Sequence, residues 1–140
     1  MLRVLLAEDY IPIREVCARL VAGNSEIVAS VGTGDDAVTA ADQHHPDVVV
    51  LDVTMPGIGG IEAACQIKAR HPEIAIVFIS SHTAGQYIAA AREIGAGGYV
   101  FKHRLVQDLQ AALAAAVSKS FFVSPEPTSS VARVHFPNAR

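Results

Sequence analysis

Short apolar segments alternate with segments of helical periodicity along most of this chain, and no other feature restricts its possible folds as strongly. Five apolar runs are predicted strands: residues 4–7, 27–31, 48–52, 75–80 and 99–101. In the segments that follow them, apolar residues recur every three or four positions, which predicts helices over residues 13–21, 36–43, 61–70, 87–94 and 105–117. The chain is therefore expected to consist of five strand–helix units in succession.

The predicted strands VVVLD (48–52) and AIVFIS (75–80) lack the alternation of apolar and polar residues that marks a strand with one face in water. Strands buried on both faces are typical of parallel sheets that carry helices on each side. Parallel neighbours also need crossover connections, which are right-handed in nearly all proteins. We therefore predict an α/β fold, a doubly wound (βα)5 arrangement around a five-stranded parallel sheet.

The composition fits one domain and excludes several classes of protein. With 140 residues, 51% of them hydrophobic and 18% charged, the chain can form one core but not two ordinary domains. The net charge of −3 gives no basic surface for nucleic acid, and no apolar run approaches the roughly 20 residues that cross a bilayer. The start of the chain lacks the pattern of a signal peptide. We expect a cytoplasmic protein that by itself binds neither nucleic acid nor membrane.

Cys17 and Cys65 each lie within a segment of helical periodicity, 48 positions apart. A disulfide framework or a metal cluster usually has more closely spaced cysteines. We interpret both residues as reduced cysteines of the core.

The alternation of strands and helices ends near Ser118. The final stretch, FFVSPEPTSSVARVHFPNAR, contains three prolines and no sustained period. This change in pattern predicts one domain over residues 1–118, followed by an irregular or mobile tail over residues 119–140.

Polar residues stand at the ends of four of the five predicted strands: Glu8, Asp9, Asp52, Ser80 and Lys102. The carboxyl ends of parallel strands meet at one edge of a sheet, and ligands bind outside that edge. Each residue taken alone could be an ordinary turn or capping residue, and Asp9 could cap the first helix. Their occurrence on four strands nevertheless predicts a site at this edge.

Three carboxylates in one pocket repel each other, so at least one pKa should rise unless a cation joins them. Oxygen ligands suit a hard divalent ion such as Mg²⁺ (or Mn²⁺). Lys102 adds a point charge suited to phosphate, and Ser80 adds a small hydroxyl donor. Because carboxylate nucleophiles form aspartyl phosphates, the group fits a phosphoryl group on Asp52, stabilised by positioning and by neutralisation of its charge.

Four motifs occur in the order and at the spacing of a known family: LLAED, VVVLDVTMPGIGG, IVFISS and GAGGYVFK. Over about residues 1–118 the chain resembles the CheY-like receiver domain of bacterial two-component response regulators. The resemblance implies a flavodoxin-like fold with strand order 2-1-3-4-5, an order found in a relative of this family. It also implies that Asp52 is the phosphoacceptor and that Glu8, Asp9, Asp52 and the backbone carbonyl of Thr54 surround the metal.

The same resemblance assigns further roles. Lys102 would pair with the phosphoryl oxygens, Ser80 would donate a hydrogen bond to one of them, and Tyr99 would be the aromatic switch residue, moving inward on phosphorylation. The donor would be a phosphohistidine on a sensor histidine kinase or a phosphotransfer protein. The chain would then be no enzyme beyond promoting its own phosphorylation and dephosphorylation. The face formed by the fourth helix, the fifth strand and the fifth helix would bind a partner or form a homodimer.

The stretch SKSFFVSPE resembles the linker of NarL/LuxR-type transcription regulators, which leads into a helix-turn-helix DNA-binding domain. No such output domain follows within the 140 residues. The chain is therefore interpreted either as a stand-alone receiver or as a receiver fragment with an atypical end, and the alternative to a linker is an ordinary polar tail.

The sequence departs from the family pattern after the lysine, where many relatives have a proline preceded by a cis peptide bond. Here His103 follows, so we predict a trans bond between Lys102 and His103. Thr54 and His82 occupy positions that border the path of the attacking water in the family. The lifetime of the phosphoryl group is therefore left open.

Other functions are less well supported by the residues. The six histidines form no ligand motif and are interpreted as solvated surface residues, and VGTGDD lacks the full dinucleotide-binding fingerprint. A phosphohydrolase of the haloacid-dehalogenase type needs a second aspartate two positions after the nucleophile, where this chain has Thr54. A phosphate-independent interaction module on the same fold remains the alternative.

Overall fold

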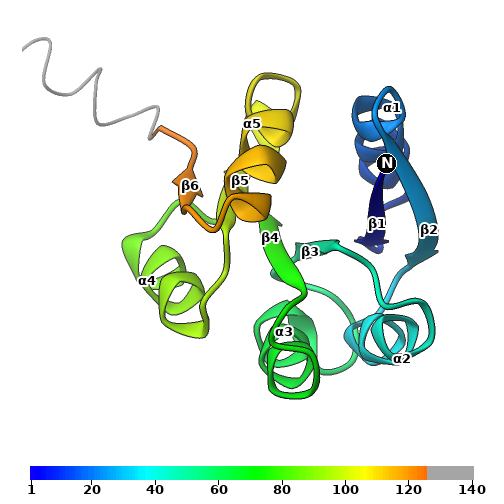
Figure 1. Ribbon diagram of the computed structural model, residues 1–140. Helices are drawn as coiled ribbons and strands as arrows, with labels where there is room; N and C mark the ends of the chain where they lie inside the picture. Colours follow the sequence, from blue (N-terminus) through cyan, green and yellow to red (C-terminus); the bar gives the residue numbers. More distant parts are fainter. Residues whose placement is uncertain (126–140) are drawn as a thin grey trace, which may run out of the picture.

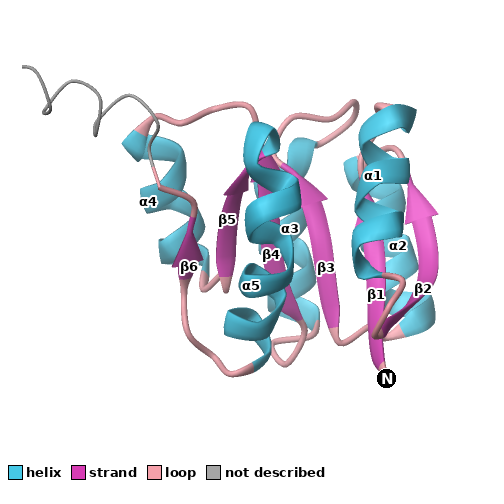
Figure 2. Ribbon diagram, turned by 90° about the horizontal axis from the view of Figure 1, so that it is seen from above, coloured by secondary structure: helices cyan, strands magenta, loops and turns pink. Residues whose placement is uncertain are grey.

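The computed structural model describes residues 1–125 and shows a six-stranded, fully parallel sheet between two layers of helices (Figures 1 and 2). The strands are β1 (Leu2–Ala7), β2 (Ser25–Val31), β3 (Val48–Asp52), β4 (Ala75–Ser80), β5 (Gly98–Phe101) and β6 (Phe122–Val123). The helices are α1 (Ile11–Val21), α2 (Gly34–His44), α3 (Gly59–Arg70), α4 (Gly85–Ile94) and α5 (Leu105–Val117), with a 3-10 turn η1 (Lys102–Arg104) before α5. The strand order is β2-β1-β3-β4-β5-β6, which confirms the predicted order 2-1-3-4-5 and adds one strand.

The sheet is buried on both faces, as its sequence predicted. Along β3, Val48 and Val50 pack with α1 and α5, whereas Val49 and Leu51 pack with α2, α3 and α4. Figure 1 shows the same division, with α1 and α5 on one side of the strands and the other three helices opposite them. Because both faces of the strand are covered, all its side chains are apolar until Asp52.

Four helices begin two residues earlier than predicted, at Ile11, Gly34, Gly59 and Gly85. Three of these first turns open with glycine, so they add nothing to the apolar periodicity on which the prediction depended. Helix α1 has Pro12 in its first turn, and its N-cap residue is Tyr10, without a side-chain capping bond. The alternative that Asp9 caps this helix is therefore wrong.

The connection from β3 to α3 depends on glycine. A Cβ atom on Gly60 would overlap the backbone carbonyl oxygen of Asp52, so only glycine lets the helix begin this close to the strand. The amide of Gly60 donates to the carbonyl of Val53 (2.9 Å), and Gly57 and Gly59 adopt positive φ angles of 86° and 79°. The loop therefore folds back tightly beside Asp52.

The sixth strand adds a short pairing at the edge of the predicted five-stranded sheet, formed by residues of the predicted tail. Phe122 and Val123 pair with β5 in parallel, opposite Gly98 and Tyr99. A strand of two residues is too short to show a period, so its sequence pattern could not reveal it. Residues 126–140 of the predicted tail lie outside the described residues.

The two cysteines are free, and they differ in burial. Cys17 lies in the core, where burial, reinforced by the charge of Glu8, raises the pKa of its thiol to about 12. Cys65 is exposed on α3, contrary to the prediction, because the buried face of this helix is formed by Ala63, Ala64 and Ile67. Each helix within residues 1–125 is too short or too polar to span a bilayer.

Candidate functional site

The carboxyl ends of β1, β3, β4 and β5 meet around a pocket of about 680 Å³. It is lined by Glu8, Asp9, Tyr10, Ile13, Asp52, Thr54, Ser81, His82, Lys102 and His103. The structure thus brings five of the predicted site residues to one pocket, while Ser80 and Tyr99 are buried beside it. Tyr10, Ile13 and Ser81 were missed because nothing in their sequence context marks them as lining residues.

Lys102 contacts two buried carboxylates at once. Its Nζ lies 3.0 Å from Oδ2 of Asp52, to which it donates a hydrogen bond, and 2.9 Å from Oε1 of Glu8. The contact with Glu8 is an ion pair without hydrogen-bond geometry. Glu8 is only 1% exposed and Asp52 only 3%, so two acids share one ammonium group away from bulk water.

Backbone amides hold the remaining carboxylate oxygens. The amide of Tyr10 donates to Oε2 of Glu8 (3.0 Å), and the amide of Thr54 donates to Oδ1 of Asp52 (3.2 Å). The main chain of Glu8 is itself fixed, because its amide donates to the carbonyl of Val31 and its carbonyl accepts from Nε of Arg14. The orientation of both acids is therefore set by the backbone as well as by Lys102.

Glu8, Asp9 and Asp52 could hold a metal ion, since one carboxylate oxygen from each lies within 4.8 Å of the others. Oε1 of Glu8 is buried and has no hydrogen-bond partner among the described residues. Within residues 1–125, Lys102 is the one cation that contacts this oxygen, and it is shared with Asp52, so the acids of the pocket can accept a further cation or a proton. The oxygen-only donor set fits a hard divalent ion such as Mg²⁺.

The electrostatics of the site agree with its geometry. Burial raises the pKa of Glu8 from its ordinary value of 4.5 to about 7; the Tyr10 amide and Lys102 oppose the rise, and the charge of Asp52 adds to it. Burial lowers the pKa of Lys102, but the neighbouring carboxylates of Glu8 and Asp52 raise it further, so the net direction is upward. Lys102 therefore stays charged at neutral pH, whereas Glu8 is near its titration midpoint.

Ser80 and Tyr99 are joined through the backbone of His82. The amide of His82 donates to Oγ of Ser80 (2.8 Å), and the hydroxyl of Tyr99 donates to the carbonyl of His82 (2.8 Å). The ring of Tyr99 is fully buried beside Phe78 and Phe101. In this conformation the ring already lies in the inward position that we expect on phosphorylation, and the switch role of Tyr99 stays a prediction.

Two exposed histidines are ordered by stacking at the rim of the pocket. The ring of His82 stacks on Tyr87 of α4 at 4.5 Å, and its Nε2 lies 3.3 Å from Oγ1 of Thr54. The ring of His103 stacks on Phe101 at 5.7 Å. Both residues are exposed as predicted, yet they form part of the pocket lining. No peptide bond within residues 1–125 is cis, which confirms the predicted trans bond before His103.

Known proteins resemble this chain over most of its length. The sequence model of the response regulator receiver domain matches residues 4–114. The chain is 39% identical over 119 residues to transcriptional regulatory protein PdtaR of Mycobacterium tuberculosis, covering 84% of this chain and 57% of PdtaR. It is 28% identical over 138 residues to response regulator GacA of Pseudomonas viridiflava, covering 97% of this chain and 64% of GacA. The chain thus spans less than two thirds of the length of these relatives.

Solved structures give the same result for the fold. A two-component response regulator of the LuxR family from Aurantimonas sp. SI85-9A1 has a TM-score of 0.85 and 29% identity, over 96% of this chain and 97% of that chain. A LuxR-family DNA-binding response regulator from Staphylococcus aureus has a TM-score of 0.78 and 27% identity, over 84% of this chain and 99% of that one. The family match covers well over half of the sequence, and the fold agrees throughout. The chain therefore belongs to the response regulator receiver domain family.

Proposed function

We propose that Asp52 accepts a phosphoryl group from a phosphohistidine on a sensor histidine kinase or a phosphotransfer protein. Phosphoryl acceptance is the standard function of the receiver domains of two-component response regulators. The single observation that carries the assignment to Asp52 is the position of Lys102, whose Nζ contacts Asp52 and Glu8 in one pocket. An ammonium group between two buried acids is placed to neutralise an anion bound at the same point.

The carboxylate of Asp52 supports the role of nucleophile because it is buried, oriented and open to the pocket. As one of its oxygens bonds to phosphorus, the bond from phosphorus to the donor imidazole breaks, and that nitrogen keeps the electron pair and is protonated. No separate general base is needed for this transfer. A bound Mg²⁺ (or Mn²⁺), held by Glu8, Asp9, Asp52 and the carbonyl of Thr54, would neutralise charge on the phosphoryl oxygens.

Two neighbouring side chains would then hold the phosphoryl group. Lys102 already lies 3.0 Å from Asp52 and would pair with a phosphoryl oxygen. Oγ of Ser80 accepts from the amide of His82, so its own hydrogen remains free to donate to a second phosphoryl oxygen. A phosphoryl group adds about −1.5 to −2 charge. The attraction of this charge for Ser80 and Lys102 would shift the conformation of β4, β5 and α4. That shift would change the affinity of the α4–β5–α5 face for a partner or for a second copy of the chain.

The test is incubation with acetyl phosphate and Mg²⁺, followed by intact-mass measurement. The wild-type chain should gain the mass of one phosphoryl group, and Asp52→Asn should gain none. Asp36→Asn, which changes an exposed acid on α2, is the matched control and should behave like the wild type. Phosphorylation of Asp52→Asn to the wild-type extent would contradict the assignment.

A phosphate-independent interaction module is the alternative outcome of the same experiment. It would be supported if the wild type gained no mass from acetyl phosphate or from a phosphorylated kinase.

We also propose, from the change in sequence pattern, that residues 1–118 are the receiver and that residues 119–140 serve as a linker. The chain spans only part of its relatives, so the activity of a longer protein is outside this assignment.

A further inference from the structure

The chain runs back along the outer edge of the sheet after α5. Lys119 adopts a left-handed conformation (φ 63°) just beyond the end of that helix, and residues 121–124, here named the strap, then lie beside β5 (Figures 1 and 2). The amide of Phe122 donates to the carbonyl of Gly97 (3.1 Å), and the amide of Ser124 donates to the carbonyl of Tyr99 (3.0 Å). The strap thus covers backbone groups that β5 would otherwise leave unpaired at the end of the sheet.

The side chain of Ser124 fastens the strap. Its Oγ accepts a hydrogen bond from the amide of Phe101 (3.1 Å) and donates one to Oδ2 of Asp108 on α5 (2.6 Å). Asp108 also accepts from Nε of Arg104 (2.7 Å) and from a terminal guanidinium nitrogen of Arg104 (3.2 Å). Ser124 is only 3% exposed and Asp108 only 6%, so these are buried hydrogen bonds whose loss would leave polar groups unpaired.

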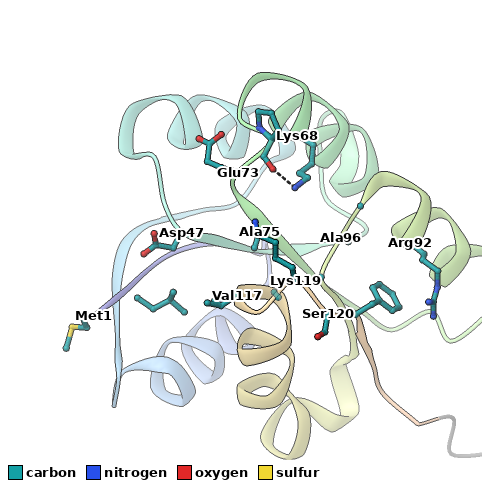
Figure 3. A pocket seen from close by; sticks show the side chains of 16 residues that line it. Met1, Asp47, Lys68, Glu73, Ala75, Arg92, Ala96, Val117, Lys119 and Ser120 are labelled. Carbon is teal, nitrogen blue, oxygen red and sulfur yellow. Dashed lines mark hydrogen bonds between the residues drawn. The ribbon is translucent and has the colours of Figure 1, made fainter.

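The other end of the strap is held more loosely. The guanidinium of Arg92 on α4 lies 4.3 Å from the centre of the Phe121 ring. Next to it is a pocket of about 730 Å³ at the amino ends of the strands, which Lys119, Ser120 and Phe121 line together with Arg92 and Lys68 (Figure 3). Lys68 does not reach the strap, since its Nζ donates to the carbonyls of Pro72 and Ile74. Phe121, Phe122 and Val123 pack against the apolar cores, and Ser124 supplies the buried side-chain hydrogen bonds of the strap.

We propose that the strap is an autoinhibitory contact, which closes the β5 edge against pairing with a second copy of this chain. An open edge strand presents unpaired N–H and C=O groups, and every copy presents the same edge, so pairing about a two-fold axis is the direct alternative to the strap. The strand behind that edge, GYVF, is buried and carries aromatic and β-branched residues that favour strand pairing. Release of the residues around Ser124 would expose it.

The strap also contacts the residue that links it to the phosphorylation site. Ser124 binds the carbonyl of Tyr99, while the hydroxyl of Tyr99 reaches the carbonyl of His82, whose amide binds Ser80. A displacement of Tyr99 would therefore disturb both ends of this series of hydrogen bonds. The inference rests on the proposed function in one respect, the identification of the α4–β5–α5 face as the partner-binding face. The contacts of the strap form without a phosphoryl group.

The test uses the full chain without Mg²⁺ or phosphoryl donor. In Ser124→Ala, we expect the amides of Phe101, Phe122 and residue 124 to exchange hydrogen about tenfold faster than in the wild type. Light scattering should then show a mass that rises towards the dimer with concentration, while the wild type stays monomeric. Ser124→Thr keeps the hydroxyl and should restore slow exchange and the monomer. Ser120→Ala, at an exposed serine of the same segment, is the matched control and should change neither.

Each other outcome would overturn the proposal. Wild-type exchange rates in Ser124→Ala would show that the serine does not fasten the strap. Fast exchange without association would show that the strap does not protect the edge, and association with slow exchange would place the contact on another face. Dimerisation of the wild type to the same extent as Ser124→Ala would also overturn the proposal. None of these results depends on whether Asp52 is phosphorylated, so the two proposals fail separately.

Discussion

Two buried polar clusters, each with one basic residue, differ in how completely the oxygens of their acids are paired. Both oxygens of Asp108 accept hydrogen bonds, from Arg104 and Ser124. Burial raises the pKa of Asp108, but these hydrogen bonds lower it more, so the net pKa is below its usual range. At the carboxyl edge, one oxygen of Glu8 has no hydrogen bond, and burial raises the pKa of this acid to about 7.

The difference indicates what each cluster is for. Asp108 is satisfied by the protein alone, so it contributes to holding α5, β5 and the strap together. Glu8 and Asp52 share a single lysine, and the excess of acid remains until a proton or a cation joins them. The incompletely paired cluster at Glu8 and Asp52 can therefore take a ligand. The completely paired cluster at Asp108 maintains the structure.

The largest expected effect concerns the stability of the metal-free protein between pH 5 and pH 8. Because the pKa of Glu8 is raised on folding, the folded chain holds a proton that the unfolded chain releases above about pH 4.5. The free energy of unfolding should therefore fall as pH rises towards and through about 7, by up to about 3 kcal/mol. Urea unfolding in the presence of a chelator measures it.

Glu8→Gln should remove most of this dependence, whereas Glu15→Gln, at an exposed acid of α1, should retain it. The pair separates the contribution of Glu8 from that of an acid outside the site. Equal slopes in the two variants would show that Glu8 is not the group responsible.

The second effect is a loss of stability at the fully paired cluster. Asp108→Ala leaves the hydroxyl of Ser124 and the guanidinium of Arg104 without their acceptor, so the free energy of unfolding should drop by about 2 kcal/mol at neutral pH. Urea unfolding with an unchanged dependence on denaturant checks this value. Glu93→Ala, at an exposed acid on α4, should cost less than about 0.5 kcal/mol. A similar loss in both variants would remove the contrast between the clusters.

The third effect is on Mg²⁺ binding, measured by calorimetry. A divalent ion needs Glu8 ionised, so the affinity should rise about tenfold for each pH unit below about 7 and level off above it. Glu8→Gln should bind more weakly, with an affinity nearly independent of pH between 5.5 and 7.5. Binding to the wild type with no dependence on pH would mean that the ion does not use Glu8.

The sequence was sufficient to predict the positions of the site residues because the topology determines them. In a parallel sheet, residues that follow the strands must meet at one edge, so Glu8, Asp9, Asp52 and Lys102 could be brought together before any contact was known. Prediction of the strand order depended on the resemblance to a family as well. The assigned roles of these residues remain predictions until phosphorylation is measured.

What the sequence could not reveal depends on single contacts rather than on periods. Asp108 lies on a helix rich in alanine and leucine, and its burial follows from the return of Ser124, 16 residues away along the chain. Tyr99 could be located on β5, but not its bond to the carbonyl of His82, which depends on the shape of the loop after β4. Cys65 was misplaced because a shift of one position on α3 moves a side chain from the core to the surface.

The contact between Gly60 and the carbonyl of Asp52 has a mechanical consequence. The start of α3 is in direct contact with the main chain of Asp52, so this side of the pocket has no space to move away from an added group. We expect the opposite wall, residues 81–84, to yield instead, since it forms no helix or strand. A group added to Asp52 would thus displace residues 81–84 towards α4 and leave α3 in place. Substitution of Gly60 would move α3 away from Asp52 and remove this difference between the two sides.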